Sequence, residues 1–317
     1  MSKRRITKQQ QRRIKARQDS HIDDEQGLNE PGLVVAHHGT GVTVEDQDGH
    51  RRHCKLRQHL GIIVAGDEVM WQRQGQTGGV VTALCERKSV LTRPDARGVN
   101  RPIAANIDKM LIVLAPEPCA SSLLIDSYLV AAETLGIEPC LVLNKCDLAP
   151  LIREQKLDTL LTSYEQLNYT VVEVSAHEGS GIDHLQSVLK NHTSVFVGQS
   201  GVGKSSLIAT FLPHATIAVG ALTDKQRLGK HTTSRAELYH LNKNARLIDS
   251  PGIREFNLWK MTPAEIAEAF IDFKPFLGQC KFRDCRHVSE PQCAIHQACK
   301  DGLIQPSRYQ NYLSLIG

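Results

Sequence analysis

The sequence predicts a multidomain protein in which a β-barrel, an α/β domain and a cysteine-rich helical domain follow one another. Short β segments come first, apolar strands alternate with helices in the middle, and cysteines cluster near the end. A length of 317 residues accommodates two or three domains, each with its own core. The expected boundaries are 1–31 for a basic arm, 32–90 for the barrel, 91–104 for a linker, 105–258 for the α/β domain and 259–317 for the helical domain.

The composition excludes several classes of protein. Hydrophobic residues make up 41% and charged residues 23%, an ordinary globular balance, and aromatic residues make up only 5%, too few for a surface of many stacked rings. No apolar run approaches the roughly 18 residues that span a bilayer. The first residues lack the apolar segment of a secretory signal. We therefore expect a cytoplasmic protein that does not associate with membranes.

The positive charge is concentrated in the N-terminal arm. Residues 1–18 contain eight Lys or Arg and no acidic residue, and removing these charges from the net +4 leaves −4 on the rest of the chain. Such an arm is expected to be disordered in isolation and is a common means of reaching nucleic-acid phosphates. The alternative is a tail that serves only solubility.

Short β segments punctuated by Gly and Asp predict the barrel. They are Gly32–Ala36, Gly41–Val44, His53–Leu56 and Glu68–Trp71. About 60 residues suit a five-stranded OB-fold barrel. The pattern alone does not separate this fold from an SH3-like barrel.

Apolar runs that alternate with helical stretches predict a doubly wound parallel sheet in the α/β domain. The predicted strands are Met110–Leu114, Cys140–Leu143, Thr170–Val174 and Val195–Val197. The predicted helices are Ser122–Leu135, Leu151–Leu167 and Gly203–Phe211.

A phosphate-binding loop follows the last of these strands and opens a helix. Its G-x-x-x-x-G-K-S motif lets backbone N–H groups surround phosphates at a helix N-terminus. Lys204 would reach the β- and γ-phosphates, and the Ser205 hydroxyl would ligate Mg²⁺. A chance Gly-rich turn is the alternative, which the strand–loop–helix context disfavours. The expected phosphate-binding residues are Gly198, Gln199, Ser200, Gly201, Val202, Gly203, Lys204, Ser205 and Ser206.

A second motif, N-K-C-D, indicates that the base is guanine. The Asp147 carboxylate can accept two hydrogen bonds from the N1–H and 2-amino groups of guanine, a donor pair that adenine lacks. Asn144 would support the base, and the aliphatic stem of Lys145 can cover the ring. A four-residue match is weak evidence for guanine binding by itself, and it becomes strong evidence when the phosphate-binding loop lies in the same sheet. The expected base-site residues are Asn144, Lys145, Cys146, Asp147, Ser175 and Ala176.

Two further segments complete the predicted nucleotide site. In the D-x-x-G segment, Asp249 would approach Mg²⁺ through its second coordination shell, and the Gly252 N–H would contact the γ-phosphate. In a switch segment, Thr232 or Thr233 would ligate Mg²⁺, and we favour Thr233.

The residue after the D-x-x-G segment is unusual. Many GTPases place there a Gln that orients the attacking water, whereas this chain has Ile253, which offers no side-chain hydrogen bond. We therefore expect slow intrinsic hydrolysis. His231 is a candidate for the missing group, and the alternative is an ordinary exposed loop histidine.

Clustered cysteines predict a metal site in the helical domain. The chain has nine cysteines, an odd number, and four of them lie between Cys280 and Cys299, which favours metal binding over disulfides. Three thiolates and one imidazole form a closed tetrahedral set typical of structural zinc. His296 and Cys299 lie close enough to compete, and cysteines buried without a metal are the alternative. The expected zinc ligands are Cys280, Cys285, His287 and Cys293.

The order of the motifs is permuted. The base motifs at 144–147 and 175–176 precede the phosphate-binding loop, whereas GTPases ordinarily have them last. With the linker L-T-R-P at 91–94, P-I-A-A-N-I-D at 102–108, the motif at 198–207 and the cysteines, this order resembles the circularly permuted, small-ribosomal-subunit-dependent GTPases (the RsgA/YjeQ family). The resemblance covers about residues 32–317.

The resemblance implies an OB barrel, a permuted GTPase domain and a zinc domain. It implies GTP hydrolysis that is slow alone, stimulated by the small ribosomal subunit and coupled to its late maturation, with Mg²⁺ bound to GTP, one structural Zn²⁺ and a catalytic role for His231. The implied partners are the subunit with its rRNA and other assembly factors, and we expect a monomer. The alternative is a GTP-gated RNA-binding module in which hydrolysis is incidental; a zinc- and RNA-binding protein with a vestigial phosphate-binding loop is disfavoured because every nucleotide motif is intact.

Overall fold

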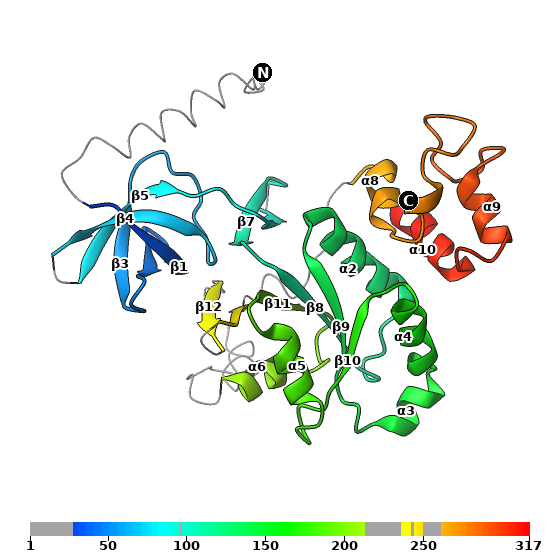
Figure 1. Cartoon of the computed structure of the whole chain (residues 1–317), viewed down its shortest axis with the longest axis horizontal. Helices are drawn as coiled ribbons and strands as arrows, with labels where there is room; N and C mark the ends of the chain where they lie inside the picture. The colour runs from blue at the N-terminus through cyan, green and yellow to red at the C-terminus, as the bar shows by residue number, and fades with distance from the viewer. Residues whose placement is uncertain (1–27, 76, 96, 213–235, 242–243, 250–260) are drawn as a thin grey trace. The chain divides into compact units, whose positions relative to one another are not determined.

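A computed structural model describes residues 28–75, 77–95, 97–212, 236–241, 244–249 and 261–317 (Figure 1). These residues form two compact units. The first extends to Asn106 and includes residues 236–238, and the second contains the remaining described residues. Within the described ranges, no helix has both the length and the apolar character that crossing a membrane requires.

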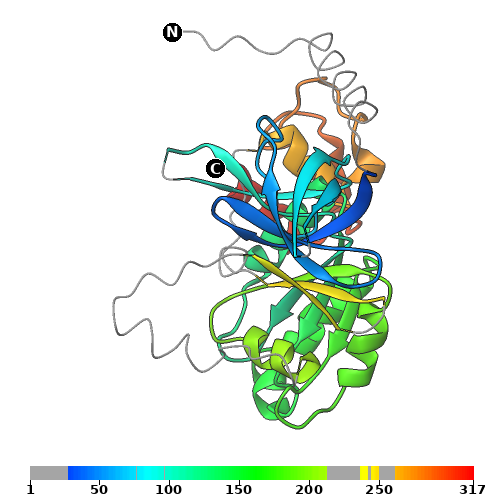
Figure 2. The ribbon, with the colours of Figure 1, turned by 90° about the vertical axis from the view of Figure 1, so that its left-hand side faces the viewer.

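The first unit contains the predicted five-stranded barrel (Figure 2). Its strands pair in the order β1-β2-β3-β5-β4, and β4 pairs back onto β1, which closes an OB-type barrel. Buried residues from all five strands surround the fully buried Trp71. The barrel prediction is thereby confirmed. The strands are β1 (Glu30–His38), β2 (Gly41–Glu45), β3 (Arg51–Leu56), β4 (Glu68–Gln74) and β5 (Gly78–Leu84).

The segment predicted as a linker, 91–104, is ordered as an antiparallel hairpin. It consists of β6 (Val90–Pro94) and β7 (Asn100–Ala105). Its turn is held by Asp95, whose carboxylate accepts backbone N–H groups of Arg97 and Val99 at 2.9 and 3.0 Å and pairs with Arg101 at 2.8 Å. An Asp that accepts hydrogen bonds from the backbone just after it is a common turn device, so the hairpin follows from local chemistry.

The second unit is built on a parallel sheet of order β10-β9-β8-β11-β13. The strand β12 (Glu237–His240) has its first two residues in the first unit and its last two in the second. All six residues of the central β8 are buried, which explains the apolar run Met110–Leu114, and the one charged residue, Lys109, pairs with Glu138. The strand order reverses between β8 and β11, and ligands bind at such a reversal, beyond the carboxyl ends of the strands. The parallel strands are β8 (Lys109–Leu114), β9 (Glu138–Leu143), β10 (Thr170–Glu173), β11 (Thr193–Val197) and β13 (Arg246–Asp249).

Helices cover both faces of this sheet, α2 and α4 on one face and α5 and α6 on the other (Figure 1). The single helix predicted over 151–167 is instead two helices, because Lys156 adopts a left-handed conformation with φ of 54° and turns the chain. The other two predictions match α2 and α6 closely. The helices are α2 (Ser122–Leu135), α3 (Ala149–Glu154), α4 (Leu157–Glu165), α5 (Ile182–Leu189) and α6 (Lys204–Phe211).

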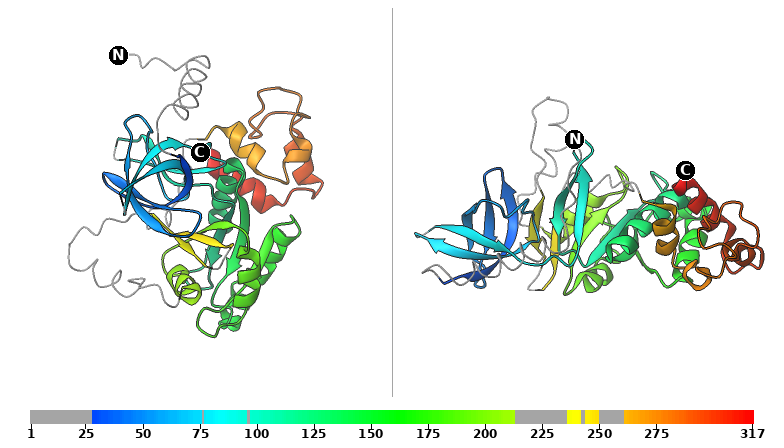
Figure 3. Two further views of the ribbon diagram at one scale, coloured as in Figure 1. Left: turned by 60° about the vertical axis from the view of Figure 1, so that its left-hand side comes forward. Right: turned by 90° about the horizontal axis from the view of Figure 1, so that it is seen from above.

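The C-terminal helices pack against α2 within the second unit (Figure 3). Their core is aromatic: Phe270, Phe273 and Tyr312 form mutual ring contacts with centroids 4.9 to 5.8 Å apart, and Val130 of α2 joins them. Thr262 and Glu265 form a capping box at the start of α8. The elements are α8 (Pro263–Ala269), the 3₁₀ turn η2 (Lys274–Phe276), α9 (Ala294–Lys300) and α10 (Pro306–Ile316).

Candidate nucleotide site and metal centre

The phosphate-binding loop connects β11 to α6 and depends on its glycines. Gly198, Gly201 and Gly203 have φ values of 134°, 86° and 94°, a region that side chains disfavour. A Cβ on Gly198 would lie 2.2 Å from the Val113 carbonyl oxygen, and one on Gly203 would lie 2.2 Å from Asn144 Nδ2. The loop therefore curls tightly against the ends of β8 and β9, and its helix N-terminus favours bound anions.

Lys204 begins α6 and is buried, with 6% of its surface exposed. Its Nζ donates to the Gly198 carbonyl oxygen at 2.6 Å and also to that of Gln199. The ammonium group therefore lies inside the curl of the loop. Ser205 and Ser206 follow in the first turn of α6, Ser205 partly buried and Ser206 exposed. The loop thus presents one cation and a helix N-terminus to the same small volume.

Asn144, at the carboxyl end of β9, joins three motifs. Its Nδ2 donates to the Val202 carbonyl oxygen at 2.8 Å, and its Oδ1 accepts the Ala176 N–H at 3.1 Å. The side chain is almost wholly buried, so both bonds are shielded from water. A single amide therefore fixes the base motif, the serine–alanine segment and the phosphate-binding loop relative to one another.

The base motif continues along the loop after β9. The Ser175 hydroxyl donates to Asp147 Oδ1 at 2.5 Å and itself accepts the Glu178 N–H at 3.1 Å. Lys145 has a left-handed φ of 61°, and Cys146 Sγ lies 3.4 Å from Ser180 Oγ. The Asp147 carboxylate is half-buried and held in place, as recognition of a donor pair requires.

The loop between β8 and α2 also belongs to this site, although the sequence analysis did not single it out. Lys145 Nζ donates to the Glu117 carbonyl oxygen at 2.6 Å, and Pro118 Cδ lies 3.5 Å from the position of a Cβ on Gly201. Its position could have identified it from the sequence. The loop follows the central strand β8 at the reversal of strand order, and ligands bind at such reversals.

Asp249 ends β13, which pairs in parallel with β11, so this carboxylate is at the same edge of the sheet as the phosphate-binding loop. The remaining predicted switch residues lie outside the described part of the chain. They are His231, Thr232, Thr233 and Gly252, together with Ile253.

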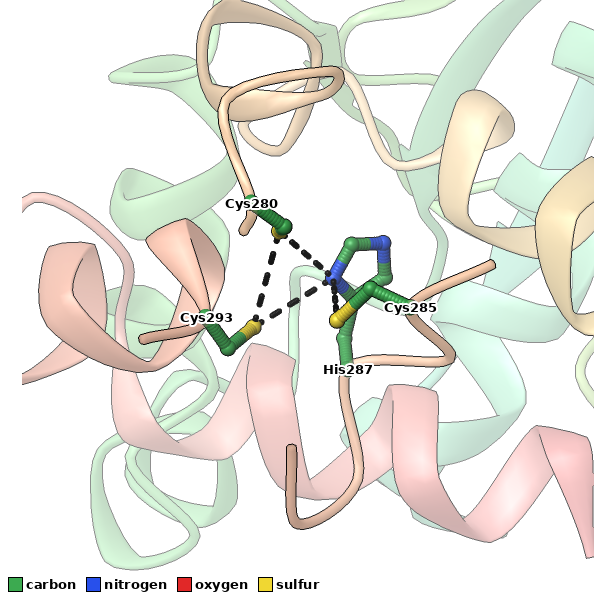
Figure 4. Close-up of side chains that lie close together, drawn as sticks. All are labelled: Cys280, Cys285, His287 and Cys293. Atoms are coloured by element: carbon green, nitrogen blue, oxygen red, sulfur yellow. Dashed lines mark hydrogen bonds between the residues drawn. The ribbon is translucent and has the colours of Figure 1, made fainter. Parts of the chain in front are cut away.

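The structure brings together Cys280, Cys285, His287 and Cys293, the four predicted metal ligands (Figure 4). His287 Nδ1 lies 3.5, 3.6 and 3.4 Å from the sulfurs of Cys280, Cys285 and Cys293, and the Cys280 and Cys293 sulfurs are 3.9 Å apart. Donors arranged tetrahedrally about one zinc ion would be separated by about 3.5 to 3.8 Å, given zinc–sulfur and zinc–nitrogen distances of about 2.3 and 2.0 Å. The residues therefore fit a tetrahedral metal ion.

The protonation of this cluster also suits a cation. Burial raises the pKa of Cys285 to about 12 and also raises the pKa of Cys293, so the thiols need a nearby positive charge to ionise. Burial lowers the pKa of His287, which keeps the imidazole neutral and able to coordinate.

The two competing residues are not in the cluster. His296 Nε2 is 2.6 Å from the Tyr309 hydroxyl and 3.1 Å from the His287 carbonyl oxygen, so its ring contacts a ligand's backbone instead. Cys299 packs with the aromatic core of the C-terminal helices. The geometry therefore selects Cys293 over both alternatives.

The parallel sheet, the phosphate-binding loop at its strand reversal and the base motif earlier in the chain define a circularly permuted GTPase domain. Comparison with known families agrees: residues 84–259 match the family described as RsgA GTPase. The chain belongs to the RsgA GTPase family.

Full-length relatives and solved structures support this assignment. The chain is 45% identical to a protein of Azotobacter vinelandii and 44% identical to one of Pseudomonas aeruginosa, over 100% of its length and 98% of theirs, and both are named "Small ribosomal subunit biogenesis GTPase RsgA". The crystal structure of YjeQ from Thermotoga maritima is similar over 91% of this chain and 98% of its own, with 34% identity and a TM-score of 0.76. The structure of YloQ, a circularly permuted GTPase, covers 91% of this chain and 94% of its own, with 25% identity and a TM-score of 0.70.

Proposed function

We propose that this protein hydrolyses GTP to GDP and phosphate on the small ribosomal subunit and couples hydrolysis to late maturation of that subunit. The observation that carries the proposal is the Asn144 amide, whose two bonds hold a guanine motif against a phosphate-binding loop. The relatives that match this chain along its whole length are named for biogenesis of the small subunit.

In this proposal the described residues bind and orient the nucleotide. Asp147 accepts the N1–H and amino group of guanine, Lys204 contacts the β- and γ-phosphates, and the N–H groups of residues 198–206 surround the phosphate oxygens. The Lys204 ammonium, which donates to the Gly198 carbonyl in this structure, would exchange that acceptor for a phosphate oxygen.

Hydrolysis needs Mg²⁺, which supplies charge stabilisation on the phosphates when bound. We assign Ser205 and Thr233 as its protein ligands, Asp249 as a contact through water and the Gly252 N–H as a contact to the γ-phosphate. Ile253 cannot orient a water molecule, so hydrolysis is slow until His231, or a group from the subunit, is ordered at the site.

The cysteine cluster would hold one structural Zn²⁺. Three thiolates and an imidazole fill all four positions of a tetrahedral ion, which leaves none for a substrate. The protein would act as a monomer in the cytoplasm, contacting rRNA and other assembly factors of the small subunit.

The decisive experiment is single-turnover GTP hydrolysis by the full chain, alone and titrated with purified small and large ribosomal subunits. The proposal expects a clear acceleration by small subunits only, together with tighter co-sedimentation in the presence of a non-hydrolysable GTP analogue than with GDP. Equal rates with and without small subunits would contradict coupled hydrolysis and would favour the alternative, a GTP-gated RNA-binding module in which hydrolysis is incidental. Equal affinity in both nucleotide states would sink the coupling, since a ligand without differential affinity shifts no equilibrium.

A further inference from the structure

The loop that precedes α2 touches both halves of the nucleotide site. Its Glu117 carbonyl oxygen accepts Lys145 Nζ at 2.6 Å, and Pro118 lies against Gly201 of the phosphate-binding loop. The same loop ends at Ser121, which caps α2 by accepting the Leu124 N–H at 3.3 Å. The loop therefore connects the base and phosphate motifs to the first turn of α2.

One turn further along α2 is a fully buried carboxylate, Asp126. Its oxygens accept the Tyr164 hydroxyl and Asn311 Nδ2, each at 2.7 Å, and Arg308 NH1. Burial raises the pKa of Asp126, and the three donors oppose that rise by stabilising its charge. Two of these donors come from α10, so the carboxylate joins α2 to the last described helix.

Arg308 is itself fixed on a second side. Its Nε and NH2 donate to the two carboxylate oxygens of Asp272 at 3.2 and 2.7 Å, and its guanidinium carbon lies 4.4 Å from the Phe270 ring centroid. Burial alone would lower the pKa of Arg308, but the two carboxylates raise it above its ordinary value. The planar Arg308 guanidinium is held by two carboxylates and an aromatic ring, and these contacts fix it in one orientation. Apolar packing alone would not impose that orientation.

The same helix reaches the metal cluster. From α10, the Tyr309 hydroxyl donates to the His287 carbonyl oxygen at 2.8 Å, and the Tyr312 hydroxyl donates to that of Arg286 at 2.7 Å. Directional bonds therefore run from the nucleotide loops through α2 and α10 to the backbone of a metal ligand.

We propose that Asp126 is a positioning residue for the nucleotide site, through which nucleotide binding and the docking of α10 on α2 stabilise each other. The proposal deepens the proposed function, since it rests on nucleotide binding at the site described above. Coupling of this kind is reciprocal: if bound nucleotide tightens the contact of α10 with α2, loosening that contact weakens nucleotide binding by the same factor. Buried ion pairs seldom add net stability over apolar packing. We therefore infer that the Asp126–Arg308 pair serves to fix the orientation of α10 on α2.

Hydrogen exchange on the unmodified full chain tests the coupling without any substitution. With GDP and Mg²⁺ we expect slower exchange at residues 198–206 and 115–121, and also in α10, by about 3-fold or more. Protection at the first two segments with no change in α10 would overturn the coupling while leaving the nucleotide site intact. No protection at 198–206 would overturn the nucleotide site, and the coupling with it.

Substitutions separate positioning from simple stability. Asp126→Asn removes the charge opposite Arg308 and should weaken GDP binding about 5-fold, seen as faster release of a fluorescent GDP analogue, with metal content unchanged. Tyr164→Phe removes a single hydrogen-bond donor to Asp126 and should speed GDP release by a smaller factor. It tests the proposal if the Asp126 variant does not fold. Lys274→Ala breaks an exposed 3.2 Å ion pair between η2 and Glu133 of the same α2, and should leave GDP release unchanged. Folded Asp126 and Tyr164 variants that release GDP like the unmodified chain would refute the proposal.

Discussion

Ser175 donates its hydroxyl hydrogen to the Asp147 carboxylate at 2.5 Å, and the pair brings together the ends of two neighbouring parallel strands, β9 and β10. Ser175 is fully buried and cannot rotate freely toward water. The carboxylate is therefore oriented before any base arrives, which reduces the entropy lost on binding.

Asp147→Asn should reverse the preference for the base. An amide presents a donor to the 2-amino group of guanine, so GDP affinity should fall by about 100-fold or more, whereas xanthine nucleotides, with a 2-oxo group, should gain. Competition between the two nucleotides in an equilibrium binding assay measures this. Asp183→Asn, an exposed carboxylate on α5, is the matched control. Guanine selectivity that survives in the Asp147 variant would show that the base is read elsewhere.

Lys204→Ala should abolish GTP turnover and leave the fold intact. The ammonium donates to two carbonyl oxygens of its own loop, and losing these exchangeable bonds should change the free energy of unfolding by no more than about 1 kcal/mol. Circular dichroism and thermal unfolding measured beside turnover separate the two effects. Lys190→Ala, at the exposed end of α5, controls for removing a positive charge. An unfolded Lys204 variant would assign the residue a structural role.

Removing the metal should loosen the C-terminal helices. Cys285→Ser or a strong chelator should lower the metal content from one ion per chain to none and expose residues 277–293 to protease, because metal-binding energy in a small unit is folding energy. Cys299→Ser is the matched control, since its sulfur is outside the cluster, and it should retain one ion. A protease-resistant, metal-free C-terminal region would argue against a structural metal.

Glu290→Gln should speed metal loss without removing a ligand. Burial alone would raise the pKa of Glu290, but hydrogen bonds from the backbone N–H groups of Arg286, Val288 and Ser289 lower it to about 2. The carboxylate is therefore ionised at neutral pH, and its hydrogen bonds organise the loop that carries the metal ligands. Such outer-shell partners typically affect metal affinity by about 10-fold or more. Transfer of the metal to a chromogenic chelator measures the rate. A rate equal to that of the unmodified chain would mean that the loop is held by other bonds.

Deleting residues 1–18 should weaken binding to the small subunit and flatten its dependence on salt. Each phosphate contact that is lost should reduce the slope of log affinity against log salt by about 1. Intrinsic GTP turnover should stay near its starting value. Co-sedimentation over a range of salt concentrations tests this, and an unchanged slope would leave the arm as a solubilising tail.

The sequence predicted what depends on local pattern. Continuous apolar runs marked the parallel strands, and glycine spacing marked the phosphate-binding loop, because both requirements are met by residues close together in the chain. The break at Lys156 escaped prediction because a lysine in a left-handed conformation carries no compositional signal. The hairpin within 91–104 was not specified either, because the sequence analysis described this segment only as a linker and did not consider the turn at Asp95.

Contacts between distant segments could not be predicted from local pattern. The pairing of Asp126 with Arg308 was not predicted, because nothing in the sequence near either residue specifies the other. The sequence did favour Cys293 as the fourth metal ligand, and the geometry then excluded His296 and Cys299, which have plausible ligand spacing but lie outside the cluster. The roles of His231 and Thr233 stay predictions from sequence.

The pairing of Asp126 with Arg308 also sets an order of events while the chain is being synthesised. The acid is made 182 residues before its cationic partner, so an early-folding sheet must carry α2 with an unneutralised carboxylate on the face that α10 will later cover. Burying that charge alone would be costly, so we expect this face of α2 to stay hydrated until α10 emerges. The nascent sheet can therefore form early, while its final docking waits for the C-terminal helices, and an amino-acid change at Arg308 should reduce the yield of soluble protein more than it reduces the stability of molecules already folded.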